Sequence, residues 1–335
     1  KKEFLLDPIE QKTKIERAKK SGRQGATHLT PSDLKDFFPC PRKWIFKDLL
    51  RVNEFSLDTD LFETYDQGSV NHKILEMYFN SLKETGLALP TVSDSDGKIT
   101  IDGQQEYEDK ILRPLLEEFA GEAFKEARSY KKSALVKEAL KSQNKSFAQT
   151  VIKFLREFCK QENFGGWTIE QTEWGKDKDI DVPPILQGRM DLVLRSPQNT
   201  IAILDYKNSG YSIPKGDLTL KKQEQNPDGS PKELDDCQIA AYVLLWENAN
   251  PNPADSVQKA SFVSIKSYDE KKVIDPQPRG NVVSRDQFVG ALQSLARQLG
   301  RMNQSLQEAS FSLKDVRPYK HCVECDYRYL CRSAY

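Results

Sequence analysis

Apolar residues in the first part of the chain recur at helical spacing. Between residues 68 and 82 they fall three or four positions apart, as on one face of an amphipathic helix. These residues are Val70, Ile74, Leu75, Tyr78 and Leu82. A shorter helix is expected to begin at Thr30, whose hydroxyl can cap it and is followed by Pro31 at the first helical position. Pro39 should end this helix, because proline breaks the backbone hydrogen-bond ladder.

Charged residues dominate the segments around these two helices. Residues 1–28 are charged and weakly patterned, which predicts a solvated arm. Residues 92–104 predict a loop. The Lys- and Glu-rich stretches 105–141 and 146–160 predict two helices, which together form a helical insertion over about 105–160.

In the centre of the chain the helical period ends and strand patterns begin. Residues 168–174, 187–195 and 200–207 predict three consecutive strands, with proline-containing turn signals between them. Residues 208–231 are rich in Gly, Pro, Asn and Lys, which predicts a long loop.

The last third of the chain predicts a helix, a strand and another helix, over residues 231–247, 260–266 and 285–306. Strands that alternate with helices in this way favour an α/β fold. We expect a single domain over residues 29–335.

The composition is typical of a soluble globular protein, with 38% hydrophobic and 30% charged residues among 335. The longest apolar run, residues 239–246, is much shorter than the roughly 20 residues that a membrane-spanning helix needs. Lys plus Arg and Asp plus Glu both number 50, so any nucleic-acid surface must be local. The first residue is Lys1 rather than Met, which favours a piece of a longer protein.

Acidic residues stand at the ends of two predicted strands. Gly188 and Asp191 open one strand, and Asp205, Tyr206 and Lys207 close the next. Because side chains alternate along a strand, Asp205 and Lys207 point the same way, while Tyr206 packs in the core and offers its carbonyl oxygen. Two carboxylates at the ends of neighbouring strands can converge on one hard cation such as Mg²⁺. A lysine beside that cation can orient a water and stabilise charge on phosphorus.

Three polar positions extend this pattern. His72 lies four residues after Gly68 on the predicted helix, and beside two carboxylates its imidazole is a suitable third metal ligand. Gln238 and Tyr242 lie four residues apart on the helix after the strands, so they share a face, and both can donate to phosphate oxygens. Glu173, which ends the preceding strand, could add a carboxylate beyond the direct ligands.

Three cysteines lie within ten residues of one another in the tail over about 314–335. They are Cys322, Cys325 and Cys331. A tetrahedral site or a 4Fe–4S cluster needs a fourth ligand, and the remaining candidates are Cys40, Cys159, Cys237 and His321. We choose Cys40, which two prolines flank. Cys159 and Cys237 fall inside amphipathic helices, where free cysteine acts as a small hydrophobe. The spacing indicates metal binding in a reducing compartment, the cytoplasm, and leaves iron–sulfur and zinc open.

Together these motifs resemble the RecB-type branch of the PD-(D/E)xK nuclease superfamily. The resemblance covers residues 68–72, 188–191, 205–207 and 238–242, in the order and spacing of that family. The cysteine layout is similar to that of the iron-staple nucleases, which include AddB-type helicase–nuclease subunits and CRISPR-associated exonucleases. The implied fold is a restriction-endonuclease-like αβββαβ core with inserted helices, in which an iron–sulfur staple joins the N- and C-terminal regions.

The resemblance implies a role for each matching residue. The implied ligands of Mg²⁺ or Mn²⁺ are His72, Asp191, Asp205 and the carbonyl group of Tyr206. The implied catalytic residues are Lys207, Asp191, Asp205, Gln238 and Tyr242. The implied ligands of a 4Fe–4S cluster, or of Zn²⁺ as the alternative, are Cys40, Cys322, Cys325 and Cys331. The chain departs from the commoner pattern at Asp205, where the family frequently has Glu.

The implied activity is metal-dependent hydrolysis of DNA phosphodiester bonds by an exonuclease, in repair, recombination or defence. The expected partner is DNA, as a single strand or a duplex end. No Gly-x4-Gly-Lys-Ser/Thr motif occurs, so the motor of any helicase partner would lie in another chain or in further sequence. The alternative is a catalytically inactive DNA-binding scaffold with a structural cluster or zinc. The presence of Asp191, Asp205 and Lys207 argues against that alternative.

Overall fold

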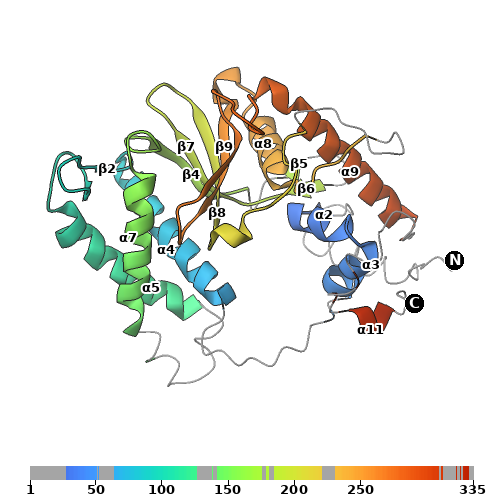
Figure 1. Ribbon diagram of the computed structural model, residues 1–335, viewed down its shortest axis with the longest axis horizontal. Coiled ribbons are helices and arrows are strands. Elements are labelled where there is room, and N and C mark those ends of the chain that lie inside the picture. Colours follow the sequence, from blue (N-terminus) through green and yellow to red (C-terminus); the bar gives the residue numbers. More distant parts are fainter. Residues whose placement is uncertain are drawn as a thin grey trace.

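A mixed five-stranded sheet, in the order β10–β9–β8–β7–β4, forms the centre of the protein (Figure 1). Its strands are β4 (Thr168–Trp174), β7 (Met190–Arg195), β8 (Ile201–Lys207), β9 (Val257–Ser264) and β10 (Glu270–Ile274). Strands β8 and β9 run parallel, and all other neighbours in this sheet run antiparallel. The computed structural model describes residues 28–50, 52, 64–126, 138, 142–175, 179–180, 185–220, 231–308, 311, 322, 325 and 327–331.

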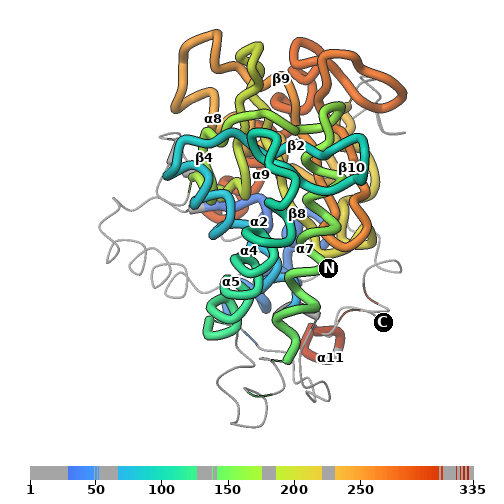
Figure 2. Tube along the Cα trace, turned by 90° about the vertical axis from the view of Figure 1, so that its left-hand side faces the viewer, coloured from blue at the N-terminus to red at the C-terminus, as the bar shows by residue number. Residues whose placement is uncertain are grey.

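Helices cover both faces of the sheet, because successive strand side chains point to opposite sides. In β8, Ile201 and Ile203 pack with one hydrophobic cluster, and Ala202 and Leu204 pack with the other. The second cluster lies under α4 (Thr64–Thr85), α5 (Arg113–Glu126) and α7 (Asn144–Phe158), the layer that faces the viewer in Figure 2. The first cluster lies under α2 (Pro31–Phe37), α8 (Gln238–Ala249) and α9 (Val289–Gln307).

The capping signal at Thr30 produces the helix that it predicts. The Thr30 hydroxyl accepts a hydrogen bond from the Asp33 backbone N–H at 3.2 Å, and the Asp33 carboxylate accepts one from the Thr30 N–H at 2.9 Å. This reciprocal pair satisfies two of the N–H groups that every helix start leaves open. The helix ends at Phe37, before Pro39, as predicted.

Short elements fill the connections. They are β1 (His28–Leu29), α3 (Pro41–Trp44), the π-helical turns at Ile45–Leu49 and Glu108–Leu112, β2 (Thr91–Val92), β3 (Ile99–Thr100), β5 (Asp179–Ile180), β6 (Ile185–Gln187), the 3-10 turns at Gly210–Ser212, Pro253–Asp255 and Asp286–Phe288, and α11 (Arg328–Cys331). Strands β1, β6 and β5 form a small separate sheet. Within the described residues, no helix has the length and apolarity needed to cross a membrane.

The sequence correctly predicted the α/β class and the helix over 68–82, although α4 is longer at both ends, over Thr64–Thr85. The three central strands are confirmed as β4, β7 and β8, with β7 beginning three residues later than predicted. The helix over 285–306 is confirmed as α9 with a preceding 3-10 turn. The charged arm over 1–28 lies outside the described residues, except for His28 in β1.

The loop predicted over residues 92–104 is wrong in part, because β2 and β3 pair there as a hairpin. Gly97 adopts a φ of 65°, a left-handed conformation that glycine tolerates, and its N–H donates to the Ser93 carbonyl at 2.9 Å. Of the helix predicted over 105–141, the structure places residues 108–126 in a π-helical turn and α5. Most of its remainder lies outside the described residues.

The helix predicted over 231–247 is wrong at its beginning, since α8 starts only at Gln238. Tertiary partners take the backbone groups of the preceding residues instead. The Leu234 N–H donates to the Ser294 hydroxyl at 3.1 Å, and the Asp235 N–H donates to the Asp217 carbonyl at 3.0 Å. These contacts with distant residues therefore outweigh the local preference for a helix that begins at Pro231.

One strand was missed and one was predicted too late. Strand β9 begins at Val257, three residues before the predicted start, and β10 follows it as a hairpin partner. The sequence of β10 begins with Glu and two lysines, so it carries little of the apolar alternation that reveals a strand. The sheet is thus wider than the expected αβββαβ core by one edge strand.

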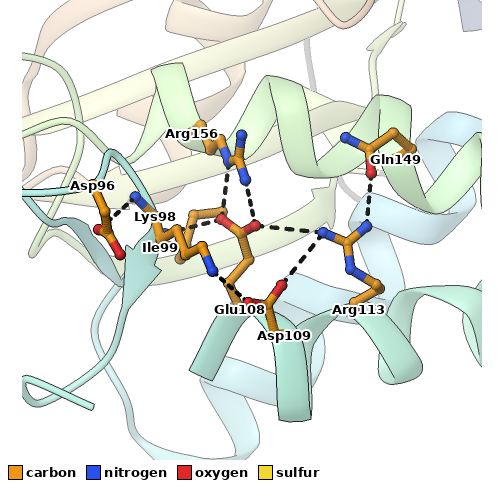
Figure 3. A network of polar contacts seen from close by, with 8 residues as sticks. All are labelled: Asp96, Lys98, Ile99, Glu108, Asp109, Arg113, Gln149 and Arg156. Carbon is orange, nitrogen blue, oxygen red and sulfur yellow. Dashed lines mark hydrogen bonds and ion pairs between the residues drawn. The ribbon is translucent and has the colours of Figure 1, made fainter. Parts of the chain in front are cut away.

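An ion-pair network joins α7 to the beginning of α5 and to the β2–β3 hairpin (Figure 3). The buried Glu108 carboxylate accepts hydrogen bonds from Arg156 of α7 at 2.9 and 2.5 Å, and from the Ile99 N–H of β3 at 3.1 Å. Arg113 of α5 lies 3.5 Å from the same carboxylate. Burial of a charge is costly unless it is paired, and here several donors surround it.

Candidate active site

The two strand-end carboxylates lie side by side. The register of the antiparallel pair β7–β8 places Leu192 opposite Leu204, so the next residues along both strands, Asp191 and Asp205, are neighbours. Both are buried, with 9% and 2% of their surfaces exposed. The backbone N–H of Tyr206 donates to Asp191 Oδ2 at 2.6 Å, which fixes that carboxylate against the end of β8.

Asp205 is held from three directions on its face of the sheet. Lys207, two residues further along β8, places its Nζ 2.6 Å from Asp205 Oδ2. Gln238, at the start of α8, donates from Nε2 to Asp205 Oδ1 at 2.6 Å and accepts from Lys207 Nζ at 3.0 Å. The Tyr242 hydroxyl lies 3.4 Å from Asp205 Oδ1 and 2.8 Å from Gln238 Nε2. The four-residue spacing on α8 therefore brings both side chains to the same carboxylate.

His72 approaches Asp191 from the opposite layer. Its Nδ1 lies 3.6 Å from Asp191 Oδ2, and its ring meets the Tyr206 ring edge-on with centroids 5.8 Å apart. The Tyr206 side chain is buried among aromatic residues that include Phe79 and Phe154, as the alternation predicted. The structure thus brings together His72, Asp191, Asp205, Lys207, Gln238 and Tyr242.

The crowded acidic groups perturb one another. Burial and the negative charge of Asp191 raise the pKa of Asp205 to about 6, although Lys207 opposes this shift. Burial acts to raise the pKa of Asp191 too, but the charge and hydrogen bond of His72 and the Tyr206 N–H outweigh it and lower that pKa. Burial opposes protonation of His72 and Lys207, yet the two aspartates raise the pKa of both bases. Pairs of groups with displaced pKa values of this kind are typical of functional sites.

Glu173 joins this group more closely than the sequence indicated. The pairs Thr172–Leu192 and Trp174–Met190 across β4 and β7 leave Glu173 opposite Asp191. Burial and the charge of Asp191 raise the pKa of Glu173 to about 7. Its φ of 47° is left-handed, which is uncommon for a residue with a side chain, and the Arg189 Nε lies 2.6 Å from its carboxylate. The signal that could have identified it is its register with the Gly188–Asp191 segment.

The donors of this cluster suit a hard divalent cation. Carboxylate oxygens are the ligands that Mg²⁺ prefers, and imidazole is acceptable to Mn²⁺. Among the residues that the structure describes, no three His, Cys, Asp or Glu side chains are arranged to hold a metal ion as they stand. The Lys207 Nζ lies 2.6 Å from Asp205 Oδ2, so the amine occupies an oxygen that a cation would need. Repulsion between the two buried carboxylates is what a bound cation would relieve.

The four predicted cluster cysteines are all half-buried, and in the described part of the chain no three of them are arranged to hold a metal ion. The elements beside them, α3 and α11, lie near each other (Figure 1). Burial and the charges of Cys331 and Cys325 raise the pKa of Cys40, and burial and the same two thiols raise that of Cys322. The C-terminal segment is anchored there by Tyr327, whose ring stacks on Phe46 at 5.7 Å and whose hydroxyl donates to the Val52 carbonyl at 3.1 Å.

The other two cysteines are buried apart from this group. Cys159 is fully buried, and Cys237 donates from its thiol to Gln298 Oε1 at 2.8 Å. Both sit among apolar residues of the two hydrophobic clusters, as predicted. Their expected position inside helices is wrong, because Cys159 follows the last residue of α7 and Cys237 precedes the first residue of α8.

Comparison with known proteins agrees with the geometry at the level of the superfamily. A search of curated proteins returned no match. Among solved structures, the one titled "Crystal structure of SSO0001" is similar to this chain with a TM-score of 0.31 and 12% identity, over 98% of this chain and 96% of that one. The family model described as "PD-(D/E)XK nuclease superfamily" matches residues 28–332. Because that match spans most of the sequence, the chain belongs to the PD-(D/E)XK nuclease superfamily.

Proposed function

We propose that this protein is a Mg²⁺- or Mn²⁺-dependent DNA nuclease of the RecB-type branch. The observation that carries the proposal is the meeting of Asp191 and Asp205, two buried carboxylates from adjacent strands, with Lys207 beside one and His72 beside the other. This arrangement combines oxygen donors for a hard cation with a lysine that can act on a phosphate.

Each residue of the site has a defined task in this proposal. When bound, the cation supplies Lewis acidity and lowers the pKa of water near the scissile phosphate. His72, Asp191, Asp205 and the Tyr206 carbonyl would hold it. Lys207 then leaves Asp205 and donates to the phosphate, where negative charge grows in the transition state. Gln238 and Tyr242 keep Asp205 oriented, because both contact its Oδ1 atom.

The four cysteines form a structural cluster in the same proposal. Their thiols come from α3 at one end of the described chain and from the segment around α11 at the other, and a 4Fe–4S cluster needs four such ligands. A cluster in this place would join the two ends of the nuclease domain and restrict the unfolded chain. Zn²⁺ is the alternative occupant, and anaerobic purification with iron and zinc analysis distinguishes the two.

The proposed substrate is DNA with a free single-stranded or duplex end, cut as an exonuclease in cytoplasmic repair, recombination or defence. A helicase subunit or domain is the proposed partner, since it would supply such ends. Support for these finer assignments comes from the cysteine layout and from the residues that match the RecB-type branch.

Digestion of end-labelled single- and double-stranded DNA, with and without Mg²⁺, tests the activity. We expect Mg²⁺-dependent loss of label in the wild type and none with Asp205→Ala. The matched control is Asp275→Ala, which removes another buried aspartate at the end of β10 and is expected to leave cleavage intact. Failure of the wild type on every substrate would favour the inactive DNA-binding scaffold instead.

A further inference from the structure

Two asparagine side chains, the buried Asn71 and the half-buried Asn208, link the helix and the strand that carry the site. Asn71 of α4 is 1% exposed and donates from Nδ2 to the side-chain oxygen of Asn208 at 3.0 Å. Asn71 immediately precedes His72, and Asn208 immediately follows Lys207. The amide pair therefore lies one residue from the candidate ligand on one element and one residue from the candidate catalytic lysine on the other.

The surroundings make this link stiff. A methyl group at Gly68 of α4 would lie 3.5 Å from Asn208 Cβ, so the helix backbone packs directly on that side chain. The Asn208 carbonyl accepts from the Lys266 N–H at 3.2 Å, and the Lys207 carbonyl accepts from the Ile265 N–H at 2.8 Å. Lys266 in turn donates from Nζ to the Gln67 side chain at 3.0 Å. The first turns of α4 are thus fastened to the ends of β8 and β9.

The Asn71–Asn208 pair leaves one of its polar atoms without a partner, so it does not maximise stability. Asn71 Oδ1 is buried and has no hydrogen-bond partner among the described residues. A buried polar atom left in this state costs stability, and removal of the Asn71 amide removes that cost. The remaining partner, Asn208, is half-buried, so water can satisfy its side-chain oxygen. Buried polar groups that do not maximise stability frequently serve to fix one arrangement of the chain.

We propose that Asn71 is a positioning residue, which holds His72 on α4 in register with Lys207 on β8 through its hydrogen bond to Asn208. The proposal rests on the nuclease function proposed above. His72 meets Asp191 from the α4 layer, whereas Lys207 meets Asp205 on the other side of the same strand ends. Any slide of α4 along the sheet would separate the imidazole from the carboxylates, and metal sites lose affinity when the groups that orient their ligands are removed.

The test is a pair of substitutions, Asn71→Leu and Asn208→Leu, with their double variant. Mn²⁺ affinity is measured by calorimetry without DNA. The kcat and KM are measured on end-labelled DNA, and Tm is measured by thermal unfolding. We expect Asn71→Leu to keep or raise Tm while it lowers Mn²⁺ affinity and kcat by about 10-fold or more, with KM little changed. The double variant should lose no more than the stronger single variant, because both act through one contact.

Glu108→Gln is the matched control, since it weakens another buried polar link in the same helical layer (Figure 3). It should lower Tm and leave Mn²⁺ affinity and kcat as in the wild type. The positioning role would be overturned if Asn71→Leu had the Mn²⁺ affinity and kcat of the wild type. It would also be overturned if these two values fell only in proportion to a fall in Tm. A wild type that cleaves no DNA defeats the proposed function separately, and weaker Mn²⁺ binding by Asn71→Leu would still support the positioning role.

Discussion

Glu173→Gln isolates the cost of crowding acidic groups at the site. The carboxylate is 18% exposed and stands opposite Asp191, and burial with that neighbouring charge raises its pKa from an ordinary value of 4.5 to about 7. At 1.36 kcal/mol for each pKa unit, the difference corresponds to roughly 3 kcal/mol between the two protonation states. Gln keeps the shape of the side chain and cannot ionise.

The sign of the effect follows from proton binding. Between pH 4.5 and 7 the folded protein binds the Glu173 proton more tightly than the unfolded chain does, so stability falls as pH rises through this window. The stability that the folded protein gains from the protonated Glu173 is fully present below pH 4.5 and is lost above about pH 7. Replacement by Gln removes this dependence, and at pH 8 the variant should be up to roughly 3 kcal/mol more stable than the wild type. Loss of the Arg189 ion pair offsets at most about 1 kcal/mol, because that arginine is largely exposed.

Urea unfolding at pH 5 and pH 8, with divalent ions removed by EDTA, measures the effect. Stability of the wild type should fall between the two pH values, and the fall should be clearly smaller in Glu173→Gln. The matched control is Glu118→Gln, which removes an exposed carboxylate from α5 and should preserve the wild-type fall. An identical fall in wild type and Glu173→Gln would refute the reasoning that Asp191 and Glu173 repel each other in the folded protein.

Three further predictions concern the cation, the lysine and the cysteines. Mn²⁺ affinity should weaken as pH falls below about 6, because protons then compete with the cation for Asp205. Calorimetry at pH 5.5 and pH 7.5 measures this change. Equal affinities at the two pH values would mean that this carboxylate binds no metal. Lys207→Met should lower kcat by about 100-fold or more with Mn²⁺ binding retained, and single-turnover cleavage at the wild-type rate would exclude a role in the transition state. Cys331→Ser should lower the Tm of the cluster-loaded protein, and an unchanged Tm would count against a staple between Cys40 and the C-terminal segment.

The sequence predicted those parts of the fold in which local pattern and packing agree. The helix face from Val70 to Leu82 is of this kind, because burial on one side leaves a regular period. The strands around Asp191 and Asp205 are buried on both faces, and they are recognisable as short apolar runs between turn signals. It failed at β10, whose first residues are charged, and at the start of α8, where Leu234 and Asp235 bond to distant parts of the chain.

In the candidate site too, local pattern predicts some residues and tertiary contacts bring in others. Asp191, Asp205 and Lys207 could be chosen because strand alternation fixes where their side chains point. The sequence indicates Glu173 only as a carboxylate beyond the direct ligands, and it gives no reason to single out Asn71. The register between β4 and β7 brings Glu173 to Asp191, and the packing of α4 on the end of β8 brings Asn71 to Asn208; neither contact is encoded in local spacing.

The central claim is that side chains from β7 and β8 share one divalent cation. Anomalous diffraction from crystals soaked in Mn²⁺ tests it most directly. We expect an Mn²⁺ peak in contact with carboxylate oxygens of both Asp191 and Asp205, with His72 next to it. A peak bound to only one of these aspartates, or occupied Mn²⁺ sites that touch neither, would contradict it.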